Sequence, residues 1–376
     1  MPDASDPHGD GAGPADLVPF PPVHHAEQAL LGALLLQPHR LSGLPLAAAE
    51  FSTAAHTALF TAMKAVQPPD PAAHTKEPLW LNTVLDTARR EARGLTASYL
   101  HALISVCPDP AHTDVYARMI REEHAHRTLD HHAAHLAQLA TDPKAPGPVP
   151  PVLAAADTLA RCLDEIAARF PPHPGPAPRT PLPPDPAPRS DDDVTAEERL
   201  LLACATAHPD RLDRVRWLLP EDLTVPLHTA LYRCITTLHR RSEPIDPVIV
   251  LWAAQRHGLH RHPTDPAAVL DLLATPAGSV EHWAERALGR SLLHQAHTAA
   301  ARIRALTADR ANSPHQLTTG ARWALTGLRA TRTRFDRTAH PQAPATAPAS
   351  RSPAATPRAG PALRTTPPTS TARATR

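Results

Sequence analysis

The segment His56-Thr57-Ala58-Leu59-Phe60 occurs a second time, with one conservative change, as His228-Thr229-Ala230-Leu231-Tyr232. Ser52 precedes the first copy and Thr224-Val225-Pro226 the second, and such residues favour the start of a helix. In each copy the histidine, the leucine and the aromatic residue fall at i, i+3 and i+4, on one helical face. The chain is therefore predicted to be duplicated, with these structural core residues: His56, Leu59, Phe60, His228, Leu231 and Tyr232.

The apolar periodicity predicts an all-α fold of two tandem small helical domains, each followed by a linker-type helix. Gly32, in the middle of the first predicted helix, indicates close packing of another helix there. Glu197 of the second copy aligns with Glu27 of the first. The predicted parts are a disordered acidic lead (1–20), domain 1 (21–142), a linker-type helix (149–170), a Pro-rich linker (171–193), domain 2 (194–310), a second linker-type helix (314–330) and a disordered Arg- and Pro-rich tail (331–376).

The composition restricts the kind of protein. Among 376 residues the chain has 46 prolines, which favours compact units joined by extended spacers, and the Pro-rich linker is expected to be such a spacer. A net charge of +1 argues against a nucleic-acid surface over the whole chain. The four cysteines form no Cys-x-x-Cys pair, and no segment has the length and apolarity of a membrane span. We expect a cytoplasmic protein.

The linker-type helix over 149–170 carries the most regular apolar pattern. Val152, Ala156, Leu159, Leu163, Ile166 and Phe170 follow one another in alternating steps of four and three, the a/d pattern of a coiled coil. Such a narrow apolar face requires a partner surface. We therefore predict that Leu159, Leu163, Ile166 and Phe170 bind a partner.

The motifs of the first copy resemble the N-terminal domain of the DnaB family of replicative DNA helicases. They are Pro22-x-x-His25-Ala26-Glu27-Gln28, Phe51-x4-His56-x2-Leu59-Phe60 and Tyr116-Ala117-x3-Arg121-Glu122, and the second copy carries a weaker version. The resemblance implies a small all-α module followed by a helical hairpin. In that family the hairpin is an oligomerisation surface, so Tyr116 and Arg121 are further candidate partner-binding residues.

The ATPase part of that family is missing from the sequence. None of the glycines is followed by lysine, so there is no Gly-x4-Gly-Lys-Ser/Thr loop to hold nucleotide phosphates. We expect a non-catalytic replication protein that binds a replicative helicase, a primase or other copies of itself. A further alternative that the resemblance implies is a helicase component that lacks its own ATPase.

Two other kinds of site have to be weighed. The run His124, His126, His131, His132 and His135 offers pairs at i, i+3 and i, i+4, but it lacks a His-Glu-x-x-His order, so a solvated helix face is favoured over a metal site. The arginines of the tail offer weak, non-specific contact with nucleic acid as the alternative function. No catalytic, cofactor or metal site is predicted.

Overall fold

The structure is a computed structural model that describes residues 20–71, 74, 79–142, 147–172, 177–187, 191–256 and 265–339. Helices and short 3-10 turns account for all its regular elements within these ranges, as the all-α prediction requires. No helix in the described ranges combines the length and apolarity that a membrane span needs. The predicted acidic lead lies outside these ranges except for its last residue, as does the predicted tail from residue 340.

The first copy, called module 1, is built from α1 (Pro22–Leu36), α2 (Ala54–Ala65), α4 (Leu79–Ala88), α5 (Ala97–Val106) and the start of α6 (Thr113–Thr141). Its core contains both leucines and aromatics, including Leu59 and Phe60 at 0% exposure. Gly32 explains how closely α1 and α5 approach, because a Cβ at this position would lie 2.1 Å from the carbonyl oxygen of Leu103. The predicted close packing is confirmed.

The second copy, called module 2, repeats this arrangement with α8 (Asp192–Ala207), α9 (Pro226–Arg240), α10 (Pro247–Arg256), α11 (Pro266–Ala274) and the start of α12 (Val280–Ala308). Its own core includes Leu231 and Tyr232 at 0% and 1% exposure. Pro226 and Pro266 occupy the first turns of α9 and α11, where a missing N–H costs nothing. Each module therefore buries its own apolar face.

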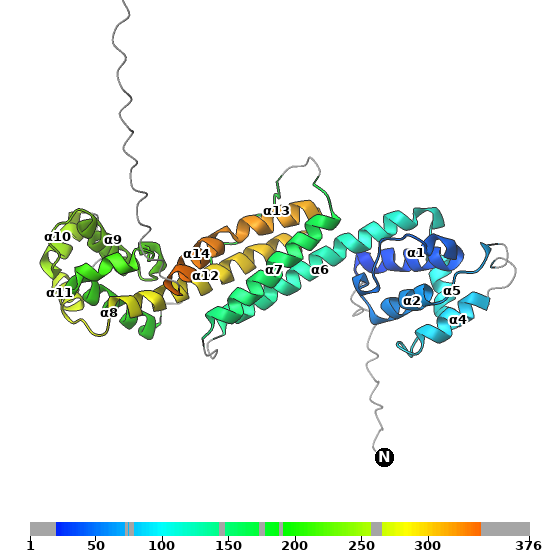
Figure 1. The fold of residues 1–376 in the computed structure, drawn as a ribbon. Coiled ribbons are helices and arrows are strands. Elements are labelled where there is room, and N and C mark those ends of the chain that lie inside the picture. Colours follow the sequence, from blue (N-terminus) through cyan, green and yellow to red (C-terminus); the bar gives the residue numbers. More distant parts are fainter. Residues whose placement is uncertain are drawn as a thin grey trace, which may run out of the picture.

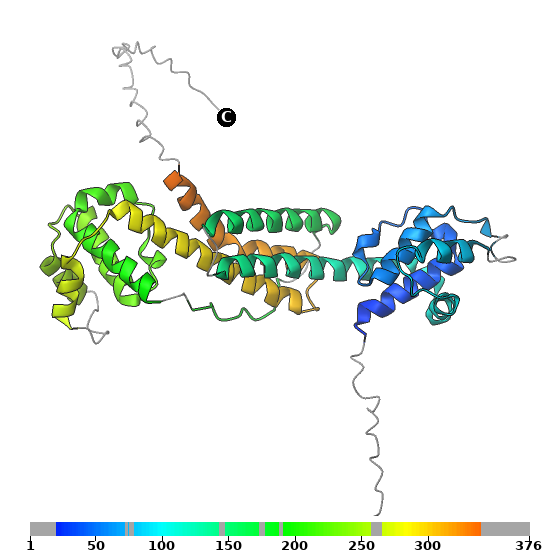
Figure 2. The same ribbon diagram turned by 90° about the horizontal axis from the view of Figure 1, so that it is seen from below.

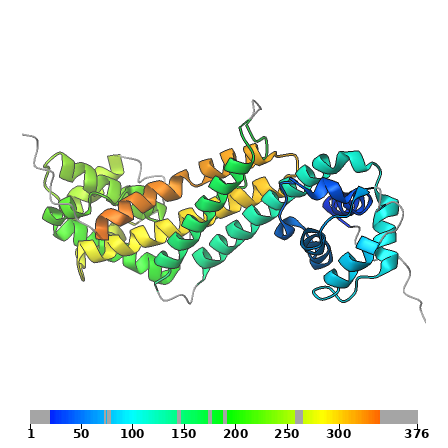
Figure 3. The same ribbon diagram turned by 45° about the vertical axis from the view of Figure 1, so that its right-hand side comes forward.

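A third core lies between the modules. It is formed by the later parts of α6 and α12 together with α7 (Val149–Arg169), α13 (Pro314–Ala324) and α14 (Thr326–Ala339), and we call these helices the central bundle. Figure 1 shows the bundle with a module at each end, and the views in Figures 2 and 3 agree. The 29 residues of α6 extend about 43 Å, so one helix reaches from the core of module 1 into the bundle.

Two predicted boundaries need correction. The second linker-type helix does not end at 330, because α14 continues to Ala339 and places helix where the disordered tail was predicted to begin. The Pro-rich linker is not a free spacer over 177–187, because Thr180 donates to Asp309 Oδ2 at 2.7 Å and Asp185 pairs with Arg302 at 2.6 Å. These side-chain contacts fix the linker to the end and the outer face of α12.

Candidate functional site

The central bundle joins the two copies of the duplication. Apolar residues of α6 and α12 face each other, with alanines between the larger side chains that let the helices approach closely. His126 is 4% exposed, and its two ring nitrogens lie 2.9 Å from Thr307 O and 3.0 Å from Asn312 O. The hairpin of α6 and α7 is thus covered by the equivalent helices of the second copy.

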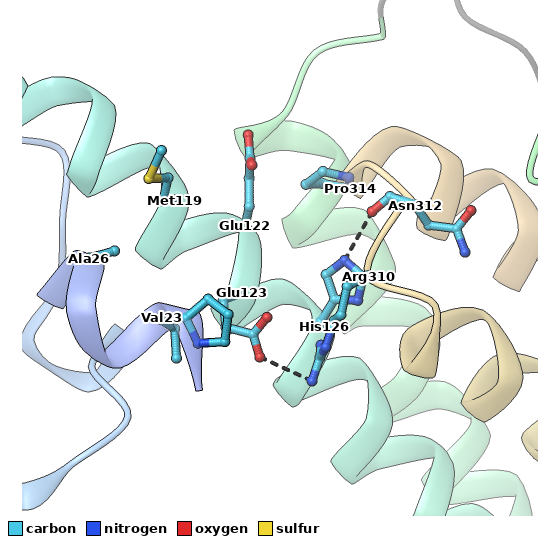
Figure 4. Close-up of a pocket in the computed structure, with 10 residues that line it drawn as sticks. Val23, Ala26, Met119, Glu122, Glu123, His126, Arg310, Asn312 and Pro314 are labelled. Carbon is cyan, nitrogen blue, oxygen red and sulfur yellow. Dashed lines mark hydrogen bonds and ion pairs between the residues drawn. The ribbon is translucent and has the colours of Figure 1, made fainter. Parts of the chain in front are cut away.

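Figure 4 shows where the α12–α13 connection meets module 1. A pocket of about 220 Å³ lies here between α1, α6 and this connection. Glu123 on α6 pairs with Arg310 at 3.1 Å, beside the bonds of His126. Because the pocket is lined by residues from both copies, it marks a contact between copies rather than a site within one module.

The predicted partner-binding residues of α7 lie inside the bundle. Leu159 and Leu163 are 0% exposed and Ile166 is 7% exposed, in the core that α7 shares with α6, α12, α13 and α14. Phe170 is partly buried, and the Arg121 guanidinium lies 5.8 Å from the centre of its ring. The partner surface that this apolar face requires is therefore supplied by the same chain.

Tyr116, the remaining partner-binding candidate, is partly buried at the surface of the module 1 core. Its ring meets His112 edge-on, with 6.2 Å between the ring centres. Both contacts lie within the module.

The predicted core residues lie where the duplication placed them, at 0 to 3% exposure: His56, Leu59, Phe60, His228, Leu231 and Tyr232. The histidines are also hydrogen-bonded. His56 Nδ1 lies 2.5 Å from Glu27 Oε2, and His228 Nδ1 lies 2.9 Å from Glu198 Oε2. The same carboxylates accept from the backbone N–H groups of Ser52 and Thr224, each at 2.6 Å. Each pair thus satisfies the polar groups where the second helix of its module begins.

These pairs correct the alignment of the two copies. The equivalent of Glu27 is Glu198 and not Glu197, which instead forms ion pairs with Arg286 and Arg290. Glu27 precedes its histidine by 29 residues and Glu198 precedes its own by 30, so the copies differ in length by one residue between the helices. The predicted alignment of Glu197 with Glu27 is therefore wrong by one residue.

His24, Glu27 and His56 have potential metal-ligand atoms within 4.8 Å of one another, a grouping the sequence analysis did not single out. Both ring nitrogens of His56 are engaged, by Glu27 and by the Tyr99 hydroxyl at 2.7 Å. The His24 ring stacks on the face of His56, with ring centres 4.9 Å apart and planes 24° apart, so the nitrogen lone pairs do not converge. This geometry is that of a hydrogen-bonded core, not of metal ligation.

The histidines of the run on α6 differ in their exposure to solvent. His131 and His135 are exposed, while His126 is buried, so the solvated face predicted for the whole run is wrong at this position. Burial lowers the pKa of His124 and His132 below the ordinary value. His126 differs from the exposed histidines, because both of its ring nitrogens face carbonyl oxygens of the second copy, those of Thr307 and Asn312.

An ion pair that was not predicted from the sequence occurs once in each copy. Arg169 at the end of α7 pairs with Glu50 of module 1 at 3.0 Å, and Arg334 of α14 donates to Asp222 of module 2 at 2.9 Å. Glu50 and Asp222 are 4% and 5% exposed. Each trailing helix is thus bound back to the module that precedes it. The dipeptide Arg-Phe, at 169–170 and 334–335, is the sequence signal that marks both sites.

We predict that module 2 loses stability in acid through Glu198. Burial raises the pKa of this carboxyl, but hydrogen bonds from His228 and Thr224 outweigh burial and hold the pKa below its usual value of 4.5. Its stabilising contribution is therefore complete above about pH 4.5 and is lost as the pH falls through the lower, folded-state pKa. Urea unfolding at pH 7 and at lower pH should show this loss in wild type and much less of it in Glu198→Gln. An equal acid loss in the variant would contradict the assignment.

Comparison with known proteins identifies the repeated unit. The family model described as DnaB-like helicase N terminal domain matches residues 20–122 and 191–287. Both matched segments end inside the long helices α6 and α12, close to where these helices leave their modules. No curated protein and no solved structure matches the chain.

Proposed function

The chain belongs to the family defined by the DnaB-like helicase N-terminal domain, and from this we propose that it is a non-catalytic, cytoplasmic adaptor of DNA replication that binds other proteins. The observation that carries this proposal is the central bundle. Because the hairpins of the two copies cover each other, the chain behaves as a self-contained pair of modules. What it offers to a partner is the outer surface of the modules at its two ends (Figure 1).

The partners that we propose are a replicative helicase and a primase. Two linked modules of one kind can engage two sites on an oligomeric partner, and linkage strengthens such binding without new contacts. Self-association through the hairpins is disfavoured, since Leu159 and Leu163 are already buried within the chain. We therefore propose a monomer that binds an oligomer.

The test uses the purified full chain with the helicase and the primase of its own host. We expect a mass in solution that stays at one chain over a wide concentration range, and a complex with at least one of the two proteins. A mass that rises to two chains would replace the proposal with self-association. Absence of binding to both proteins would overturn the adaptor role.

The non-catalytic part of the proposal rests on the lack of a phosphate-binding Gly-Lys pair in the sequence. ATP turnover by the chain alone is expected to equal the buffer rate, with and without single-stranded DNA. Turnover stimulated by DNA would contradict it.

A further inference from the structure

Module 2 has a groove beside its second helix. The groove measures about 790 Å³ and lies between α9 and the turns Pro209–Val215 and Pro220–Asp222. Its apolar lining includes Leu219, which is 43% exposed. A groove of this size and lining accepts bulky apolar side chains.

The two modules differ at one position beside this region, on the second helix of each. In module 1, Lys64 reaches across this region, donates to Leu46 O at 2.7 Å and lies 5.0 Å from the centre of the Phe60 ring. In module 2 the equivalent residue is Thr236, whose hydroxyl donates back to Tyr232 O of its own helix at 2.9 Å. The space that a lysine side chain fills in module 1 therefore stays open in module 2.

A polar group is left for a ligand at the groove. Tyr232 stands where module 1 has Phe60, is 1% exposed and lines the groove. Its hydroxyl hydrogen-bonds to no described residue and is not fully enclosed, so a ligand in the groove can reach it. Burial raises the pKa of Tyr232 far above its usual value, so the hydroxyl stays protonated and can donate to an acceptor.

The rim of the groove is cationic. Arg216, Arg233 and Arg240 line it against one carboxylate, Asp213. Asp213 is shared between Arg216 at 2.7 Å and His239 at 2.8 Å, and Arg233 forms an exposed pair with Glu221. Arg240 contacts oxygens of Thr236 and Thr237 on its own helix and pairs with no described carboxylate. The rim thus has positive charge to offer an anionic ligand.

We propose that this groove binds an acidic peptide segment of a partner protein, with an apolar side chain against Leu219 and a carboxylate near Tyr232 and Arg240. Charge complementarity favours an acidic ligand. A nucleic-acid strand fits less well, because the Tyr232 ring is buried and no other Phe, Tyr or Trp lines the groove to stack on bases. The inference deepens the proposed function and rests on it only in assuming that the chain binds proteins.

The experiment measures the affinity of the full chain for a short fluorescein-labelled peptide in which aspartates alternate with leucine and phenylalanine. Thr236→Lys should close the groove as Lys64 does in module 1 and weaken binding about tenfold, although it adds positive charge. The matched control, Ala230→Lys, adds the same charge on the same helix at a partly exposed residue that does not line the groove, and should bind at least as tightly as wild type. Arg240→Glu should also weaken binding.

Several outcomes would overturn the proposal. They are equal binding by both lysine variants, unchanged binding of a peptide with asparagine in place of aspartate, no binding of the acidic peptide by wild type, or binding of oligothymidine in its place. If Thr236→Lys does not fold, Arg240→Glu, at an exposed position, decides the question. A chain that binds the helicase or primase but not the peptide would reject the groove and leave the adaptor role standing.

Discussion

Replacing Leu163 by aspartate is expected to open the central bundle while both modules stay folded. Leu163 is 0% exposed in a core built from five helices, and a charge there can neither be solvated nor paired. We expect a loss of about 4 kcal/mol or more from the bundle. The modules have separate cores, so their own unfolding transitions should persist.

The separation of the modules in solution measures this effect. Small-angle scattering should report a wider distribution of distances for Leu163→Asp, and proteases should cut the connections around α7 sooner than in wild type. Ala154→Asp places the same charge on the exposed side of the same helix and serves as the control. A variant that keeps the scattering curve and the cleavage pattern of the wild type would show that the bundle is not held by this core.

Replacing Glu27 by alanine is expected to unfold module 1 selectively. The substitution leaves the backbone N–H of Ser52 and the ring of His56 without their shared acceptor in a site that is 0% exposed. Removing one partner of such a buried pair costs about 3–5 kcal/mol. Hydrogen exchange read by mass spectrometry should therefore show lost protection in α1 and α2 and little change in α8 and α9.

His25→Ala, at an exposed position of the same helix, is the matched control and should leave exchange unchanged. Glu198→Ala should produce the reciprocal pattern, with protection lost in module 2 alone. Unchanged protection of α1 and α2 in Glu27→Ala would contradict the structural role that we give to this pair.

The duplication and the helices could be predicted because their causes are local. The repeated pentapeptides carry the spacing of a helical face, and caps such as Thr96 and Ser279, whose side chains accept backbone N–H groups, lie beside the residues they serve. Gly32 likewise indicated a close helix contact before its neighbour on α5 was known. The predicted end of the second linker-type helix, at 330, is too early, because the apolar pattern weakens after Leu328. Beyond that residue the helix is maintained by tertiary contacts of Phe335 and Arg334.

The candidate site could be predicted only in part. The apolar face of α7 indicated that another surface packs against it, and the structure contains such a surface. The pattern of that face is the same, however, whether the surface belongs to another protein or to the second half of the same chain. The groove was missed for a different reason: Lys64 and Thr236 are ordinary helix residues, and only their side-chain positions show that one fills a space the other leaves open.

The sequence by itself determined that this protein is a duplicated all-α chain with buried pentapeptide helices and no nucleotide-binding loop, since these features depend on residues close together. Three features were decided only by the tertiary structure. Glu198 pairs with His228, an arginine of each trailing helix forms an ion pair with the module before it, and the two hairpins pack against each other. His126 shows the physical reason, because it bonds to carbonyls 181 and 186 residues away. Such a pairing follows from how the whole chain packs and not from any local pattern.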